Sequence, residues 1–311
     1  MANQDPLGRS RYFHHASAFG IAAQIDRPIQ QTIPTQAAVS LAPSGGHGSH
    51  RVGKFEIPGV LSFSSAYVEV GGSFDEVHQT HTTFASSEIE DFNISGVVRA
   101  DRIVLRLTVY YSATPKKDNS TATPESGDPP QPSFSISGSH FENLRIGGHA
   151  INVKLAGQDL SKYDTYSKVD EGYRSNGITD WLIGSGIQKQ LAAYGAEKRQ
   201  GMSVLEHNQA VLNDIATRFD KWKTTTNQAD RAFWCSAVRH ADLQEFTKNS
   251  DLLNFGGIIC VPRFGVVSLG ELRVHRSHRH FTMIRVQMRS PGSGNIDGGS
   301  GSGGGTTIPP G

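Results

Sequence analysis

The sequence predicts a mainly β protein, with an antiparallel β-sandwich or jelly-roll-like core and an α-helical hairpin inserted late in the chain. Three observations lead to this prediction. Residues 102–111 alternate between apolar and polar side chains, as a half-buried strand does. A motif that begins at Ser87 returns in similar form at Ser139. Residues 204–222 instead carry apolar side chains at three- and four-residue spacing, which is typical of a helix.

The N-terminal part gives way to a β pattern after about fifty residues. Residues 1–50 contain few periodic apolar positions and end in PSGGHGSH, so we expect a flexible N-terminal arm there. The first part of the β domain is placed at residues 51–175. Within it, residues 66–70 (AYVEV) alternate in the manner of a strand, and the glycines that follow allow a turn.

The clearest strand in the chain runs from Arg102 to Tyr111. Apolar side chains occupy one face of this segment, at Ile103, Leu105, Leu107, Val109 and Tyr111. Five prolines then lie among small polar and charged residues between Thr114 and Pro132, which indicates a long exposed loop. Strand patterns resume with SFSISG and HAINVKL.

The repeated motif reads SEIEDFNISGVV in its first copy and SHFENLRIGGHA in its second. We interpret it as a repeated strand–turn–strand unit. Asp91 or Asn143 would bond to local backbone, and Gly96 or Gly148 would adopt a backbone geometry that side chains resist. Two such units are expected to pair as neighbours or to face each other across a sandwich.

The same repeat also offers a chemical alternative. Glu90 and Glu142 occupy equivalent positions in the two copies, and glycoside hydrolysis uses two carboxylates at a fixed separation. We favour the structural interpretation, because carboxylates beside a turn are normally solvated and nothing nearby in the sequence would separate their pKa values.

The pattern changes at Asn176, and residues 176–226 are predicted to form a helical hairpin. A short helix is expected near residues 187–199, and Ser203 with Glu206 has the spacing of a capping box for a second helix. Its apolar stripe consists of Val204, Leu205, Val211, Leu212, Ile215, Phe219 and Trp222. We interpret this stripe as a packing face, with a partner-binding groove as the alternative.

The second part of the β domain is placed at residues 227–289, where strand patterns return in RAFWCSAV, in residues 257–275 and in HFTMIRVQM. Residues 290–311 follow. Nine glycines, four serines and three prolines occur among these 22 residues, so we predict a flexible tail.

Composition limits the classes of partner. The 30 Lys and Arg residues balance 29 Asp and Glu residues, so the chain has no broad charge to gather a nucleic acid or an anionic membrane. No basic-then-apolar leader or membrane-length apolar run is present, and we expect a cytoplasmic location unless a leaderless route releases the protein. The two cysteines, Cys235 and Cys260, are expected to be buried thiols.

Histidines are the candidate metal ligands, because several of the 13 cluster. His275, His278 and His280 lie in HRSHRH, and His78 and His81 lie in FDEVHQTH beside two acidic residues. Zinc needs three or four converging ligands. Arginines interleave with the first cluster, so we predict a polar hairpin tip there and a solvated loop at the second. We therefore predict no metal and no cofactor.

Motifs of the common enzyme classes are absent: the sequence contains no G-x-S-x-G, H-E-x-x-H or P-loop pattern. Cys235 and His240 could serve as nucleophile and base. On one extended strand, however, their five-residue separation would place them roughly 16 Å apart on opposite faces. We name no catalytic residue.

Three stretches resemble an uncharacterised family of bacterial proteins that has no assigned activity. They are DPLGRSRYFHHASAFG near the start, SHFENLRIGGH in the middle and GSGNIDGGSGSGGG near the end. The likeness spans most of the chain. It implies a bacterial source and a β-rich fold, and it brings no catalytic residue with it.

These observations favour a non-enzymatic structural or self-assembling protein whose terminal arms order on neighbouring subunits, that is, a homo-oligomer. Two alternatives stay open. One is a metal-dependent or acid/base hydrolase that uses the histidines and acidic residues around His78 or His275. The other is a β-sandwich module that binds a sugar or protein ligand with the loops at one end.

Overall fold

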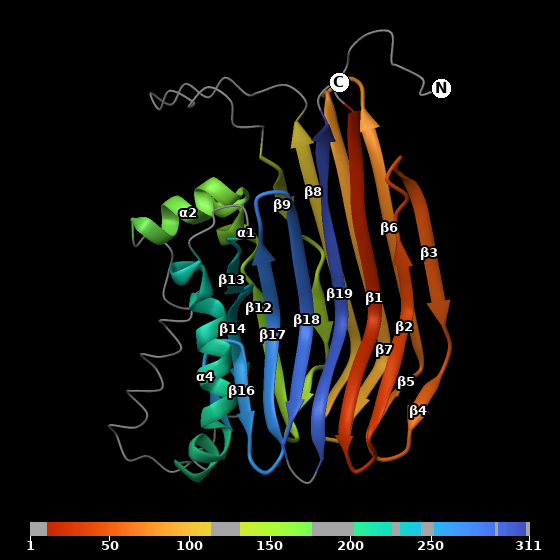
Figure 1. The fold of residues 1–311 in the computed structure, drawn as a ribbon. Helices are drawn as coiled ribbons and strands as arrows, with labels where there is room; N and C mark the ends of the chain where they lie inside the picture. Colours follow the sequence, from red (N-terminus) through yellow and green to blue (C-terminus); the bar gives the residue numbers. More distant parts are fainter. Residues whose placement is uncertain are drawn as a thin grey trace.

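The structure, a computed structural model, describes residues 11–112, 131–175, 202–225, 231–243, 252–289 and 292–308. In these residues two antiparallel sheets face each other (Figure 1). The predicted antiparallel β-sandwich is confirmed. Its core lies between the two sheets, where alternate side chains of each strand point inward.

Sheet A has eight strands in the described residues. Its main path runs in the order β15 (Leu253–Asn254), β16 (Ile258–Val261), β17 (Gly265–Val274), β18 (His278–Met288), β19 (Ser293–Ile308), β1 (Arg11–Arg27) and β2 (Gln31–Ser40). A further strand, β13 (Phe233–Ser236), pairs with the second half of β17. The middle of sheet A is therefore built by pairing β1 with β19, from Arg11 opposite Ile308 to Arg27 opposite Ser293.

Sheet B has eleven strands in the described residues, and β8 lies near its middle. On one side of β8 (Val98–Ser112) lie β7 (Thr80–Ile94), β6 (Ser65–Asp75) and β3 (Gly46–Val52), with β5 (Leu61–Phe63) and β4 (Phe55–Ile57) continuing from the end of β7. On the other side lie β9 (Ser133–Ser135), β10 (His140–Glu142), β11 (Arg145–Ile146), β12 (His149–Leu155) and β14 (Val238–Leu243).

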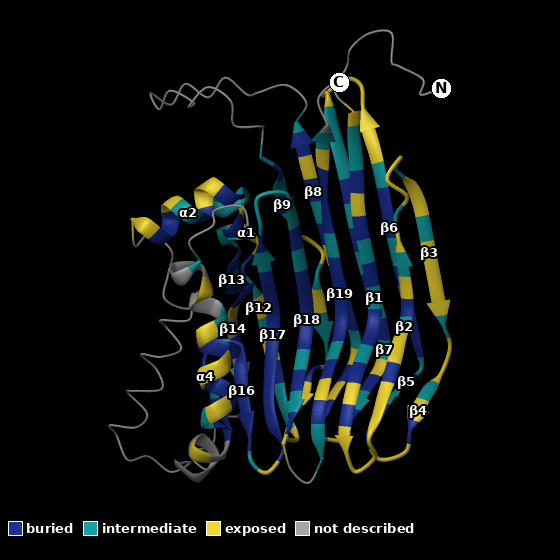
Figure 2. Ribbon diagram, viewed as in Figure 1, coloured by how far each residue is buried: buried dark blue, intermediate teal, exposed yellow. Residues whose placement is uncertain are grey.

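The strand predicted at residues 102–111 is confirmed, because these residues lie within β8 (Figure 2). Ile103, Leu105 and Leu107 are fully buried against sheet A, whereas Arg106 between them is exposed. Val104 is also buried, although it points to the opposite face from Leu105, and His140 of β10 is its cross-strand partner.

The two copies of the repeated motif form similar hairpins in sheet B. Asp91 and Asn143 both have positive φ, at 53° and 50°. Each copy then turns through two consecutive positive-φ residues, Ser95–Gly96 and Gly147–Gly148, as a tight hairpin turn requires. The copies pair with opposite edges of β8, so the repeat places two equivalent units side by side.

The ends of the chain differ from the expectation of flexible arms. Within residues 1–50, β1, β2 and most of β3 are strands, and residues 293–308 of the expected tail form β19. Glycine carries no side chain, so β19 has no alternation to detect. A Cβ atom at Gly301 would lie 2.9 Å from Leu105 Cδ2 and 3.0 Å from Ala85 Cβ. The glycines thus allow sheet B to approach β19 closely.

Helices cover one side of the sandwich. After β12 come α1 (Gly157–Leu160), a 3₁₀ turn (Ser161–Tyr163) and α2 (Tyr166–Arg174), none of which the sequence analysis predicts. The helix predicted from the apolar stripe is α4 (Met202–Thr224), and its Val211, Leu212 and Ile215 pack on the outer face of sheet A. The first helix of the expected hairpin and the side chain of Ser203 lie outside the described residues.

Candidate functional sites

The HRSHRH segment connects β17 to β18, and the side chains of its arginines pack on aromatic rings. Three guanidinium groups of this region lie over aromatic rings: Arg273 over Trp234 at 5.5 Å, Arg276 over Tyr166 at 5.5 Å, and Arg279 over Phe134 at 5.4 Å from the ring centroid. Such contacts hold a cation against an aromatic face. The arginines therefore stabilise the packing of the β17–β18 turn against the aromatic residues around it.

The three histidines of this segment do not converge. The rings of His275 and His278 stack at 4.5 Å, whereas His280 Nε2 lies 3.2 Å from Thr282 Oγ1 and 3.1 Å from Ser300 Oγ. Burial lowers the pKa of both His278 and His280 to about 4, so both are neutral near pH 7. In the part of the chain that the structure describes, no three His, Cys, Asp or Glu side chains are grouped so as to hold a metal ion.

His78 and His81 also point to different places. His78 lies in the tip of the β6–β7 hairpin, where its Nδ1 atom is 2.7 Å from Asp75 Oδ2. His81 lies on β7, and its ring stacks on Tyr12 of β1 at 4.0 Å. Burial and the nearby His14 lower the pKa of His81 to about 4. The structure therefore separates the two residues that the sequence places in one loop.

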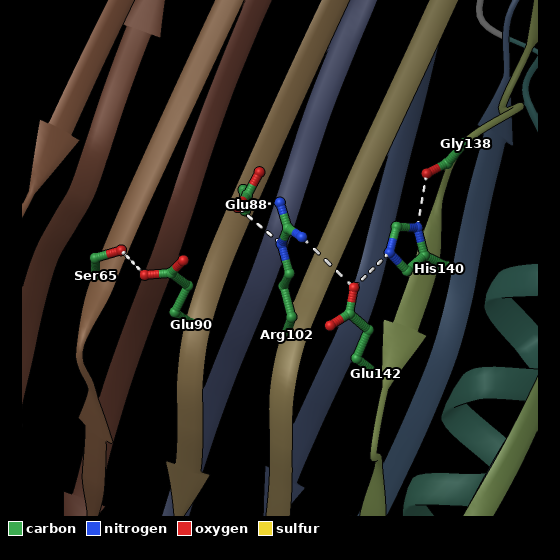
Figure 3. Close-up of polar contacts among 7 residues, drawn as sticks. All are labelled: Ser65, Glu88, Glu90, Arg102, Gly138, His140 and Glu142. Atoms are coloured by element: carbon green, nitrogen blue, oxygen red, sulfur yellow. Dashed lines mark hydrogen bonds and ion pairs between the residues drawn. The ribbon is translucent and has the colours of Figure 1, made fainter.

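Glu90 and Glu142 lie on the outer face of sheet B, with Arg102 of β8 between them (Figure 3). Arg102 Nη1 is 3.5 Å from Glu142 Oε1, and its Nε donates to Glu88 Oε1 at 2.8 Å. Glu90 instead accepts a hydrogen bond from Ser65 Oγ at 2.6 Å. The two carboxylates of the repeat thus take part in a cross-strand network of ion pairs and hydrogen bonds, which favours a structural role.

The side chains around this pair supply no enclosed space for a glycosidic bond. The side chains of Arg102 and Glu142 are 40% and 44% exposed, and Arg102 occupies the position on β8 between the two glutamates. The hydrogen bond to Glu88 and the charges of the neighbouring glutamates raise the pKa of Arg102, because they stabilise the guanidinium form. The arrangement does not match an acid and a base that flank a substrate.

A buried group of charges beneath α4 is a feature that sequence reasoning missed. Glu271 of β17 is 3% exposed, and its Oε2 atom lies 3.2 Å from Arg285 Nε. Arg285 also lies 3.0 Å from Asp297 Oδ1 of β19, and Arg218 of α4 lies 3.9 Å from Glu271. Burial raises the pKa of Glu271, and Arg285 opposes this effect. Neither GELRV nor NIDGG signals this pairing, because it depends on the register of three strands.

The cysteines are buried and free, as predicted. Cys235 lies in β13 and His240 in β14, so the two residues belong to different strands in different sheets. Burial raises the pKa of both thiols to about 12. A thiol with so high a pKa is a poor nucleophile, because the thiolate is the reactive form.

The two sides of the sandwich end differently. On one side the chain crosses from sheet A to sheet B between β13 and β14. There the amide of Ala237 donates to the carbonyl of Gly270, and its carbonyl accepts from the amide of Ala156. Asn254 Nδ2 of β15 also donates to the carbonyl of Ala241 in β14, at 2.6 Å. These bonds close that side of the sandwich.

On the other side β2 ends sheet A and β3 ends sheet B (Figure 1). The β2 edge is interrupted, because Pro34 lacks an amide hydrogen and Ala37 has a φ of 52°. Among the strands of the described residues, β3 pairs only with β6, and most of the residues of β3 are exposed. Residues 47–52 contain neither proline nor positive φ, so this edge is regular and unprotected by such devices.

Comparison with known proteins gives a family without an activity. Residues 12–275 match the model of a family described as "Domain of unknown function (DUF8256)". The chain belongs to this family. The matched stretch ends just before β18, and no curated protein or solved structure matches the chain significantly. The resemblance to an uncharacterised family is therefore confirmed. No helix in the described residues is long and apolar enough to cross a membrane.

Proposed function

We propose that this protein is a non-enzymatic structural protein that associates with a second copy of itself by pairing the free edges of sheet B. The observation that carries the proposal is the exposed edge of β3, which is regular from His47 to Val52 and has one paired side. A free edge presents a row of backbone donors and acceptors to a matching strand.

The geometry favours a closed dimer over an open filament. Two β3 strands that meet antiparallel are related by a two-fold axis, and each strand uses its single free edge in the contact. Within the described residues, the β2 edge is interrupted by Pro34 and Ala37, and the β13–β14 side is closed. No second regular edge of similar length is then offered for further growth.

This route replaces the terminal arms that the sequence predicts as the means of association. Residues 11–27 and 293–308 already pair with each other within one chain, so they cannot order on a neighbour without leaving sheet A. β3 carries His47, His50 and Arg51 and adds polar side chains to the contact. The backbone is therefore expected to supply most of the affinity, as it does in other cases of β-strand addition.

Light scattering during size-exclusion chromatography, across a wide range of protein concentration, tests the proposal. Two proline variants, Ser49→Pro and His50→Pro, sharpen the test, because successive amides in a strand point to opposite edges. One variant removes an amide that β6 uses and lowers the melting temperature. The other removes only an outward amide, so it should melt like the wild type but remain monomeric.

The variant that loses the β6 bond acts as the matched control for the one that loses the outward amide. A wild-type protein that is monomeric at every concentration would overturn the proposal. So would a dimer that persists in the variant whose melting temperature is unchanged, because such a dimer must use another surface.

A further inference from the structure

The outer face of sheet A carries a hollow that the proposed self-association does not use. β18, β19 and β1 lie side by side here, and their register places one residue from each strand in a common row. His278, Gly304 and His15 form one row, and His280, Ser302 and Ser17 form the next. The central strand thus contributes glycine and serine between two strands that carry imidazoles.

The hollow has a volume of about 300 Å³, at the small end of the range for ligand sites. Its lining consists of His15, Ser277, His278, Ser302, Gly303 and Thr306. The turn between β17 and β18 presses closely on β19, because a Cβ atom at Gly304 would lie 2.3 Å from the carbonyl oxygen of Ser277. Residues nearly three hundred positions apart in the sequence therefore form one site.

The lining offers hydroxyl and imidazole groups that can form hydrogen bonds. It contains three hydroxyls and two imidazoles, with no carboxylate, lysine or arginine. Arg276 and Arg279 of the adjoining turn lie over Tyr166 and Phe134 instead. A charged ligand would lose its hydration without gaining an opposite charge, and an apolar ligand would leave the hydroxyls unpaired. A ligand rich in neutral hydroxyl groups satisfies both conditions.

The polar groups around the hollow are held in place by one another. Ser302 Oγ lies 2.8 Å from Ser17 Oγ. Ser277 Oγ lies 3.3 Å from His275 Nδ1 and 3.5 Å from His278 Nδ1. Groups that are fixed before a ligand arrives lose less entropy on binding.

We infer that this hollow binds a neutral saccharide, with the hydroxyls of Ser277, Ser302 and Thr306 and the imidazole of His278 as its hydrogen-bonding groups. Hydroxyls and neutral imidazoles both donate and accept, as sugar hydroxyls do. The low pKa of His278, a consequence of burial, keeps that ring neutral at physiological pH.

Nuclear magnetic resonance of the histidine side chains tests the inference in the full-length protein. The probes are glucose, galactose, mannose and N-acetylglucosamine with their β-1,4- and α-1,4-linked disaccharides, and inorganic phosphate and acetate serve as anionic probes. We expect at least one sugar to shift the imidazole signals of His278 in a saturable manner, and neither anion to do so. The inference would be overturned if only an anion shifted the imidazole signals of His278, or if none of the probes shifted them.

Two variants then place the site. Ser302→Leu and Thr306→Leu fill the hollow, and Thr306 is exposed, so its variant should fold even where the first fails. Each folded variant should weaken binding at least about tenfold. Gln24→Leu makes the same kind of change at an exposed position near the other end of β1 and should leave affinity unchanged. Binding that survives Thr306→Leu at full strength would place the sugar elsewhere and refute the inference.

Discussion

Adding one methyl group to β19 tests whether the glycine-rich segment is a strand packed against sheet B. In Gly301→Ala the new Cβ would lie 2.9 Å from Leu105 Cδ2 and 3.0 Å from Ala85 Cβ. The leucine end can move, but the Ala85 methyl is fixed to the backbone, so the sheets must separate slightly. Overpacking of this kind costs roughly 1–3 kcal/mol. Loss of glycine flexibility in the unfolded chain returns roughly 0.4–1 kcal/mol.

The expected net result is a loss of about 1–2 kcal/mol in the free energy of unfolding, measured by urea denaturation. Gly53→Ala is the matched control, because a Cβ at Gly53 meets no atom within 4 Å. It should leave stability unchanged or slightly higher. If residues 293–308 were a flexible tail, Gly301→Ala would behave like this control. An unchanged or increased free energy of unfolding of the Gly301→Ala variant would therefore refute the packed strand.

A second methyl exchange identifies the contact itself. Ala85→Gly removes the methyl that the new side chain at position 301 would meet. The loss of unfolding free energy in the double variant Gly301→Ala, Ala85→Gly should therefore be about 1 kcal/mol smaller than the sum of the losses in the two single variants. Strict additivity would mean that the two positions do not touch.

Three further predictions concern the core and its charges. Leu105→Ala should cost about 2–5 kcal/mol of unfolding free energy and Arg106→Ala under about 1, because Leu105 is fully buried and Arg106 is exposed; urea denaturation measures both, and equal losses would contradict the half-buried strand. Glu271→Ala should cost about 1–3 kcal/mol of unfolding free energy, because it removes one of the two carboxylates that pair with Arg285, whereas Glu142→Ala should cost under about 1; a similar small loss for both would place the first carboxylate in solvent. His280 should make folding acid-sensitive, because its pKa is about 4 in the fold and about 6.5 when unfolded, so stability should fall as pH drops from about 6.5 to about 4. His280→Gln should flatten that decrease in urea titrations between about pH 7 and about pH 5, and an unchanged slope would show that the ring is not buried neutral.

Side-chain alternation made part of this fold predictable. From Ile103 to Tyr111, every second residue of β8 is apolar and buried because that face of the strand is the core, and the predicted strand at residues 102–111 follows from this alternation. The repeat was predictable for a related reason. Gly96 and Gly148 were expected to adopt a backbone geometry that side chains resist, and both have positive φ, at 70° and 84°.

The terminal strands carry no such signal. β1 fills its inward positions near Ala16 and Ala18 with small side chains, and β19 fills them largely with glycine, so neither looks amphipathic. Their strand structure is specified by what they pack against, and Leu105 is nearly two hundred residues from Gly301. Tertiary context therefore decides these elements, and a single sequence does not display it.

The candidate sites were predictable only as residue types. HRSHRH indicates histidines near a turn, but which rings meet depends on strand register. His278 meets Gly304 and His15 because three strands from both ends of the chain lie side by side. The buried Glu271 and Asp297 are likewise joined through Arg285 across neighbouring strands. Long-range pairing of this kind leaves no mark on local spacing.

The pairing of β1 with β19 also has a consequence for the order in which the protein can fold. Sheet B obtains its long strands β6, β7 and β8 from one continuous stretch, so its hairpins can form while the chain is still being synthesised. β1 is made early but must wait for residues 293–308 before its central edge is covered. Contacts between segments so distant in sequence slow folding, because a long loop must close first. A nascent chain therefore exposes the unpaired edge of β1 until translation passes residue 308, and this interval is when binding by a chaperone would matter most.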